Sequence, residues 1–107
     1  MTTFDERKKG FESKFAHDQE LKFKAEARRN KLLAAWAADK LGLSGDDAVA
    51  AYAKEIQRAD FEEAGDDDVF RKLRADFDAK GVTVSDDDLR KVIMDKLAEA
   101  VAQVEKS

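Results

Sequence analysis

The sequence predicts an all-α protein, a four-helix bundle with a long first helix and a mobile N-terminal arm. Three observations support this fold class: the 107 residues include no proline, apolar side chains recur at helical spacing, and capping residues or glycines mark the segment ends. Val82-Thr83-Val84 is the only β-like triplet, and it falls between two expected helix boundaries. The short loops favour antiparallel neighbours.

The first expected helix covers residues 5–41, which are rich in strong helix formers. Thr3 stands three residues before Glu6, the spacing of a capping box, and Gly42 suits the left-handed position after the last turn. Three further helices are expected to end near residue 60, at residue 81 and near residue 104. Each of them starts at a capping residue: Ser44, Asp66 and Ser85.

The first helix is too long for its partners. About 37 residues span roughly 55 Å, whereas the longest partner of about 22 residues spans roughly 33 Å. Phe4, Phe11 and Phe15 lie in the uncovered part, within about 40° of one another around a helix. Either a kink near Gly10 folds the segment back and buries the rings, or the segment is an arm that becomes helical in a partner's groove. We expect residues 1–18 to form this arm and residues 19–107 the bundle.

Charge is unevenly distributed along the chain. Residues 1–31 hold nine basic and six acidic side chains, a net charge of +3, and the remaining residues have a net charge of −7. A basic, aromatic arm on an acidic body suits an acidic protein partner or nucleic acid. Arg28-Arg29-Asn30-Lys31 is the candidate nucleic-acid contact, although a solvated helix face explains the same cluster. Because no helix carries a basic recognition face, we expect no nucleic-acid partner.

The residue types that catalysis and metal binding need are missing or wrongly spaced. The chain has no cysteine and a single histidine, His17, which excludes disulfides, thiolate sites and a placeable Ser/His/Asp arrangement. The acidic runs at 66–68 and 86–88 lack the glycine of a calcium loop and suit helix N-termini instead. There is no Gly-rich phosphate loop. We therefore expect no enzyme, no cofactor and no metal.

Composition also bears on location. Charged residues make up 41% of the chain and hydrophobic residues 43%, which is typical of a globular domain and not of a disordered or membrane-spanning chain. No apolar run approaches 18 residues, and residues 1–9 contain no apolar signal segment. We expect a cytoplasmic protein with no direct membrane insertion, and the acidic body favours a monomer when the protein is free.

Several short segments carry a family resemblance through their order and spacing. The strongest are FAHD at 15–18, ARRNKLL at 27–33 with WAA at 36–38, ADFE at 59–62, and GDDDV at 65–69. With these segments the chain resembles the zeta subunit, the ATPase inhibitor of α-proteobacterial F-type ATP synthases. The resemblance covers roughly residues 4–77, and the last predicted helix matches more loosely.

The resemblance implies a regulatory inhibitor of ATP hydrolysis. In the family, the arm enters a catalytic interface between the α and β subunits, next to the γ shaft, becomes helical there and blocks hydrolytic rotation. This implies an apolar anchor and basic groups that pair with acidic groups of the synthase. The residues expected to bind the partner are Phe4, Arg7, Lys8, Phe11, Lys14 and Phe15.

Departures and alternatives accompany this interpretation. Ala34 stands where many relatives have glycine, and Gly10 raises the cost of making the arm helical by about 1 kcal/mol. The first alternative is an assembly or structural subunit of the same synthase with little inhibition. The others are a nucleic-acid-binding bundle that uses the 28–31 cluster and a nucleotide-sensing bundle that lacks a phosphate motif.

Overall fold

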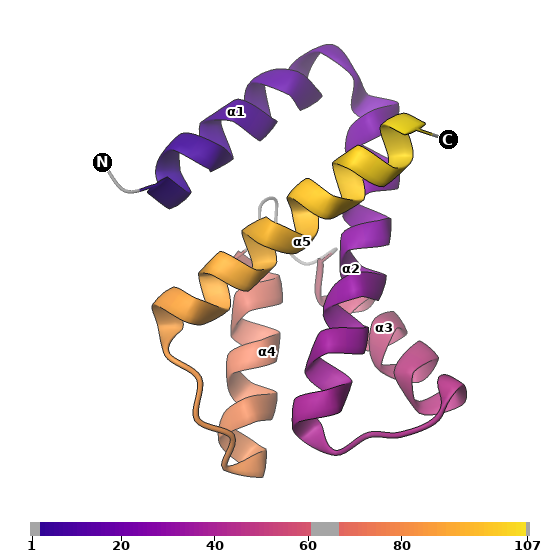
Figure 1. Cartoon of the computed structure of the whole chain (residues 1–107), viewed down its shortest axis with the longest axis vertical. Helices are drawn as coiled ribbons and strands as arrows, with labels where there is room; N and C mark the ends of the chain where they lie inside the picture. The colour runs from indigo at the N-terminus through magenta and orange to yellow at the C-terminus, as the bar shows by residue number, and fades with distance from the viewer. Residues whose placement is uncertain (1–2, 61–66, 107) are drawn as a thin grey trace.

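The computed structural model describes residues 3–60 and 67–106, and these residues form five α-helices and no strand (Figure 1). The side chains of residues 3–5 and 8 lie outside the description. The all-α class is therefore confirmed. The helices are α1 (Thr3–His17), α2 (Gln19–Leu41), α3 (Asp46–Asp60), α4 (Asp67–Lys80) and α5 (Asp86–Lys106).

The single long helix expected over residues 5–41 is corrected to two helices that meet at Asp18. Asp18 has a non-helical backbone (φ −146°, ψ 90°), and its carboxylate accepts a hydrogen bond from the Leu21 amide at 2.9 Å. This is the geometry of an N-cap, which starts a new helix and lets the chain change direction. The alternative in which the segment folds back and buries its rings is borne out for Phe15, but the break lies at Asp18 and not near Gly10, which is inside α1.

Two other boundaries follow the sequence signals closely. Gly42 ends α2 in the left-handed conformation (φ 75°), and its amide donates to the Ala38 carbonyl, as the C′ position requires. The Ser85 hydroxyl accepts a hydrogen bond from the Asp88 amide at 3.1 Å, which is half of the expected capping box. The expected cap at Asp66 lies outside the described residues.

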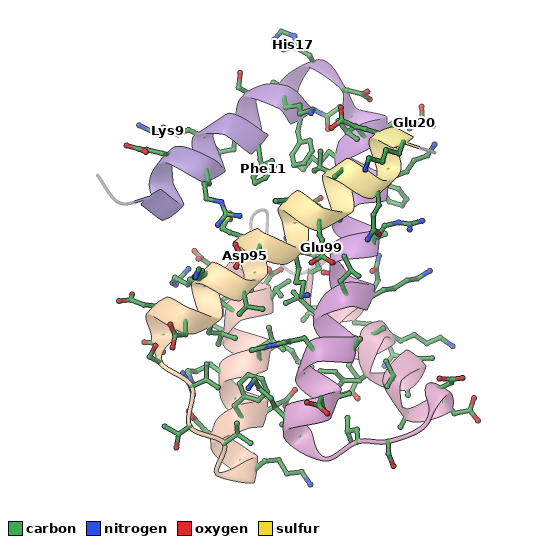
Figure 2. The ribbon with its side chains drawn as sticks, viewed as in Figure 1. Lys9, Phe11, His17, Glu20, Asp95 and Glu99 are labelled. Carbon is green, nitrogen blue, oxygen red and sulfur yellow. The ribbon has the colours of Figure 1, made fainter. Side chains whose placement is uncertain are left out.

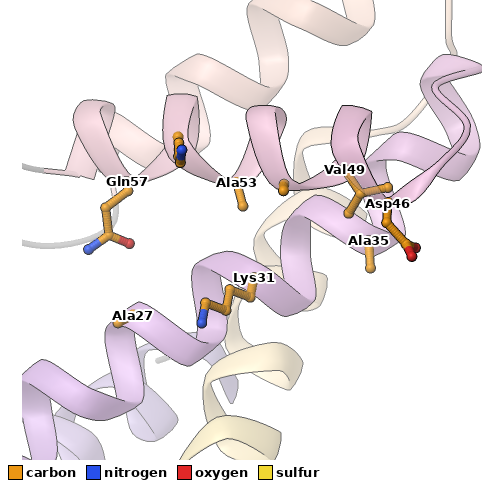
Figure 3. Close-up of a pocket in the computed structure, with 9 residues that line it drawn as sticks. Ala27, Lys31, Ala35, Asp46, Val49, Ala53 and Gln57 are labelled. Atoms are coloured by element: carbon orange, nitrogen blue, oxygen red, sulfur yellow. The ribbon is translucent and has the colours of Figure 1, made fainter.

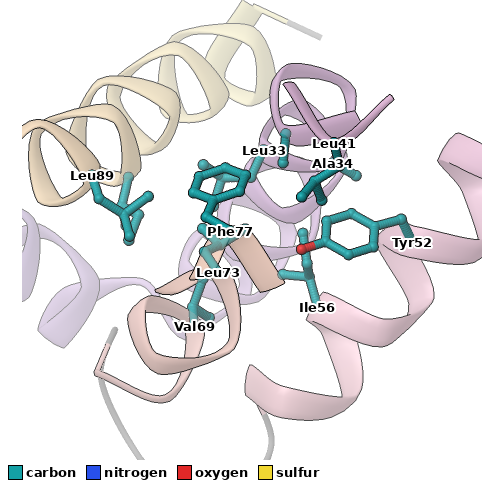
Figure 4. Packing of buried hydrophobic residues seen from close by; sticks show 11 residues of the cluster. Leu33, Ala34, Leu41, Tyr52, Ile56, Val69, Leu73, Phe77 and Leu89 are labelled. Atoms are coloured by element: carbon teal, nitrogen blue, oxygen red, sulfur yellow. The ribbon is translucent and has the colours of Figure 1, made fainter. Parts of the chain in front are cut away.

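The helix α2 is the centre of the bundle and packs against α3, α4 and α5. We call the cluster between these four helices the main core (Figure 4). Its large side chains are fully buried, and the Trp36 ring meets the Phe77 ring edge-on, with centroids 5.6 Å apart. The main core comprises Leu33, Ala34, Ala37, Leu41, Tyr52, Ile56, Val69, Leu73, Phe77, Leu89 and Ile93.

A second, smaller cluster ties α1 to the bundle, and we call it the arm cluster. Its buried residues are Phe15 of α1, Ala25 of α2, and Leu97 and Val101 of α5, with Phe11 and Leu21 packed against them. Figure 1 shows α1 beside the C-terminal half of α5, at the end of the molecule away from the α2–α3 turn. The arm cluster is separate from the main core, so the bundle does not depend on α1 for its principal packing.

Candidate functional site

One face of α1 carries four of the six residues expected to bind a partner. Arg7, Phe11, Lys14 and Phe15 follow the i, i+4, i+7, i+8 spacing that places side chains on one side of a helix. We call these four residues the basic-aromatic face. The side chains of the other two, Phe4 and Lys8, lie outside the described part of the chain.

The two basic residues of this face form ion pairs with α5. Arg7 Nη1 lies 2.9 Å from Asp95 Oδ1, and Lys14 Nζ lies 2.6 Å from Glu105 Oε1. The four side chains retain 28–46% of their exposure, so each pair contributes only about 0.2–1 kcal/mol. Acidic groups of the chain itself therefore take the places that we expected acidic groups of a partner to fill.

The aromatic residues of the same face pack against Leu97 and Val101 of α5 and Ala25 of α2. The Phe11 and Phe15 rings are stacked with centroids 6.0 Å apart, and Phe15 is only 6% exposed. Figure 2 shows Phe11 pointing from α1 toward α5, whereas His17 points away from the bundle. Burial of a phenylalanine contributes roughly 1.5–3 kcal/mol. The apolar contact therefore outweighs the ion pairs in holding α1 on α5.

Sequence reasoning missed the surface of α5 that receives this face, namely Asp95, Leu97, Val101 and Glu105. The sequence carried no separate signal for this surface, because the last helix was expected to lie along the longer first helix and to have its whole apolar stripe covered inside the bundle. In the structure, Leu97 and Val101 contact Ala25 of α2 and also receive α1.

The Arg28–Lys31 cluster does not form a basic surface. Arg29 and Asn30 are fully buried, and Arg29 Nη2 lies 3.2 Å from Asp60 Oδ2 of α3. The Asn30 amide donates to Gln57 Oε1 at 3.1 Å and to Asp60 Oδ2 at 3.2 Å. For these two residues, both the nucleic-acid contact and the solvated helix face are wrong, because the pair links α2 to α3 inside the protein.

A groove of about 690 Å³ lies between α2 and α3 (Figure 3). Small apolar side chains form most of its lining, and Lys31 and Lys54 are basic residues among the lining ones. A groove of this size could accommodate a small ligand, but the described residues around it include no glycine-rich loop that would cradle a phosphate. The nucleotide-sensing alternative therefore gains a cavity but no phosphate-binding motif.

A polar cluster between α3 and α4, in which only Tyr52 is buried, contains the described residues whose pKa values are clearly shifted. Burial raises the pKa of Tyr52, and its hydrogen bond to Asp76 Oδ2 (2.6 Å) raises that pKa further. Burial lowers the pKa of Lys72, but its bonds to Asp76 and Glu55 outweigh this and raise the pKa overall. At neutral pH, Tyr52 stays neutral and Lys72 stays charged, so this cluster is structural.

The described residues also bear on metal binding and on membrane spanning. Within the described residues, no group of three or more His, Cys, Asp or Glu side chains is placed to hold a metal ion. Among the described helices, none combines the length and the apolar character that crossing a membrane requires.

Comparison with known proteins identifies the family. No curated protein matches the chain. The family described as ATPase inhibitor subunit zeta matches residues 1–103, which is nearly the whole sequence and includes all five helices apart from the last turn of α5. The resemblance found in the sequence is thereby confirmed, and the chain belongs to the ATPase inhibitor subunit zeta family.

Proposed function

We propose that this chain inhibits ATP hydrolysis by an F-type ATP synthase and that α1 is the inhibitory element. The family to which it belongs is described as an ATPase inhibitor subunit. The observation that carries the proposal is the basic-aromatic face, which is joined to the bundle through a cluster separate from the main core. A helix attached in this way can leave without unfolding the rest of the protein.

In this proposal the arm, residues 1–18, enters a catalytic interface between the α and β subunits near the γ shaft. Phe4, Phe11 and Phe15 provide the apolar anchor there, and Arg7, Lys8 and Lys14 pair with acidic groups of the synthase. Charge pairs of this kind speed the approach of the two proteins, while buried aromatic rings supply most of the affinity. The inserted helix then blocks rotation in the hydrolytic direction.

The bundle, residues 19–107, remains outside the interface and prevents the arm from escaping. The chain acts as a regulator and performs no chemistry of its own in this mechanism. It requires no cofactor and no nucleic acid, and it works as a cytoplasmic protein that is monomeric when free.

The proposal is tested by titrating a cognate, otherwise uninhibited synthase head with the full chain. A second titration uses a variant that lacks residues 1–16 and so retains the main core. We expect only the full chain to inhibit ATP hydrolysis. Equal inhibition by both would refute the role of α1.

A non-inhibitory assembly subunit is the alternative that the same experiment addresses. If neither protein inhibits, binding of the full chain to the synthase head would favour this alternative. If the head captures neither protein, the proposed partner is wrong for this chain.

Substitutions in the arm separate the anchor from the steering charges. Phe11→Ala and Phe15→Ala should each weaken inhibition more than Lys8→Ala, because a buried ring is worth roughly 1.5–3 kcal/mol and an exposed pair about 0.2–1 kcal/mol. The measurement is the concentration of protein that halves hydrolysis. Equal effects of the three substitutions would argue against an aromatic anchor.

A further inference from the structure

We propose that α5 is a docking site for the chain's own α1 and that it competes with the synthase for the basic-aromatic face. The proposal rests on the proposed function for its competitor, but the docking itself can be measured on the isolated protein. It commits to one occupant of this surface, the helix Thr3–His17 of the same chain.

The chemistry of α5 matches that face at each point of contact. Asp95 and Glu105 stand on either side of Leu97 and Val101, just as Arg7 and Lys14 accompany Phe11 and Phe15 on α1. The ion pairs connect residues 88 and 91 positions apart in the sequence, so they are tertiary contacts made only when α1 is docked.

Docking on α5 and insertion into a partner exclude each other. The Phe15 ring is 6% exposed in the docked helix, so a partner surface cannot reach it until α1 leaves α5. Only the undocked fraction of the protein can then inhibit, and the apparent affinity is lower than the intrinsic affinity by that fraction. The strength of the contact between α1 and α5 therefore sets the potency of the inhibitor.

The contact between α1 and α5 also indicates which features a partner surface needs in order to bind α1. Whatever receives α1 has to cover two phenylalanine rings and supply acidic groups for Arg7 and Lys14. We infer that the receiving surface of the synthase is an apolar patch bordered by carboxylates. An apolar patch with a basic border would leave both cations without partners.

The backbone at Asp18 allows α1 to leave α5 while the start of α2 stays folded. Its backbone is non-helical, and the α2 cap that it provides uses only its own carboxylate and the Leu21 amide. Rotation of α1 about this residue therefore leaves the start of α2 intact. Two hydrogen bonds to the Phe15 carbonyl cross the junction, from the Asp18 amide at 3.2 Å and from the Gln19 side chain at 3.0 Å, and free rotation of α1 would break them.

The first experiment measures docking without the synthase. The double variant Asp95→Asn/Glu105→Gln removes the two carboxylates of α5 that pair with Arg7 and Lys14 and leaves α1 unchanged. The control, Asp39→Asn/Glu99→Gln, removes the same charge from two exposed residues, of which Glu99 pairs with Lys96 of its own helix, and neither pairs with Arg7 or Lys14. Hydrogen exchange of the α1 amides should accelerate roughly two- to thirtyfold in the first variant, as the loss of two exposed ion pairs implies, and stay unchanged in the control.

The second experiment measures competition. The concentration that halves ATP hydrolysis should fall in Asp95→Asn/Glu105→Gln by the factor by which the undocked fraction rises, and the matched control should behave as the parent. Because the chain has no cysteine, Lys14→Cys/Glu105→Cys can also be joined by a cleavable thiol-reactive linker. Cross-linking should abolish inhibition, and cleavage should restore the inhibition shown by the same variant before cross-linking.

The outcomes distinguish this proposal from the proposed function. If exchange of the α1 amides is the same in the double variant and its control, α1 is not docked through these contacts and the inference is overturned. Faster exchange without stronger inhibition, or full inhibition by the cross-linked protein, overturns the competition. If no form of the chain inhibits while exchange still responds, the proposed function fails and the docking site on α5 stands.

Discussion

The buried pair between Arg29 and Asp60 gives a stability prediction that the structure makes quantitative. Replacement of Arg29 by methionine keeps an unbranched apolar stem in the buried position and removes the guanidinium group. Asp60, 14% exposed at its side chain, then loses its ion pair and keeps the hydrogen bond from Asn30. Removal of one partner of a buried pair typically costs 3–5 kcal/mol.

We expect Arg29→Met to fall at the lower end of that range, at about 3 kcal/mol, because Asp60 retains the hydrogen bond from Asn30 and some contact with water. For a domain of this size, 1 kcal/mol corresponds to roughly 4 °C, so the midpoint of thermal unfolding should fall by about 12 °C. Asp60→Asn should cost at least as much as Arg29→Met, because it leaves the fully buried guanidinium of Arg29 without its ion pair, whereas the carboxylate left by Arg29→Met still reaches water.

The assay is urea unfolding followed by the fluorescence of Trp36, the single tryptophan, which packs against Phe77. Arg28→Met is the matched control, since exposed Arg28 makes one hydrogen bond of 3.3 Å to Gln103. Its expected cost is below about 1 kcal/mol. Equal destabilisation by the two substitutions would refute the structural role assigned to the buried arginine.

Three further predictions concern single positions. Gly10→Ala adds a Cβ that meets no atom within 4 Å and favours the helical state of α1 by about 1 kcal/mol. The α1 amides should therefore exchange about fivefold more slowly. Unchanged exchange would mean that α1 leaves α5 without unwinding. Gly42→Ala forces a left-handed alanine at φ +75° and should lower the free energy of unfolding by about 1 kcal/mol in urea, whereas no change would show that the turn readjusts. Because folding raises the pKa of Tyr52, the stability that this residue contributes is complete below about pH 10 and is lost as the pH rises further. Tyr52→Phe should therefore lose less stability at alkaline pH than the parent, and the loss that remains comes from Lys72, whose pKa is also raised. An unaltered dependence of stability on pH would contradict this.

Helix positions were largely readable from the sequence because their determinants are local. Gly42 and Ser85 act on residues within one turn of themselves, so their effect is visible in a short window. The break at Asp18 was equally local in its chemistry, yet it lies within a long run of helix formers. An aspartate at this position is compatible with an exposed residue inside one continuous helix as well as with the N-cap of a new helix. The packing of α1 against α5 distinguishes these two possibilities.

The candidate site was predictable on one side only. The spacing of Arg7, Phe11, Lys14 and Phe15 fixed the face on α1, because helical geometry alone determines it. The receiving residues of α5 required knowledge of how the last helix crosses the first, about 90 positions away in the sequence. The role of this face toward a partner, and the division into an arm of residues 1–18 and a bundle of residues 19–107, remain predictions.

The burial of Arg29 as a charge was hard to foresee for a related reason. Its spacing from Ala25 and Leu33 places it on the inner side of α2, but an arginine there is expected to extend its charged end to the surface unless it meets a buried partner. Its partner Asp60 lies at the end of α3, and the two meet only because α2 and α3 pack together. Whether a charged side chain is buried depends more on the partner it meets in the fold than on its neighbours in sequence.

The separation of the arm cluster from the main core divides the molecule into two cooperative units of unequal stability. The opening of α1 breaks contacts centred on Phe15, whereas the opening of the bundle must expose the whole main core, so the first costs far less free energy. Small changes in salt or sequence will shift the low-cost opening and leave the melting temperature of the bundle almost unchanged. If α1 is the inhibitory element as proposed, inhibition and global stability can therefore vary independently in this fold.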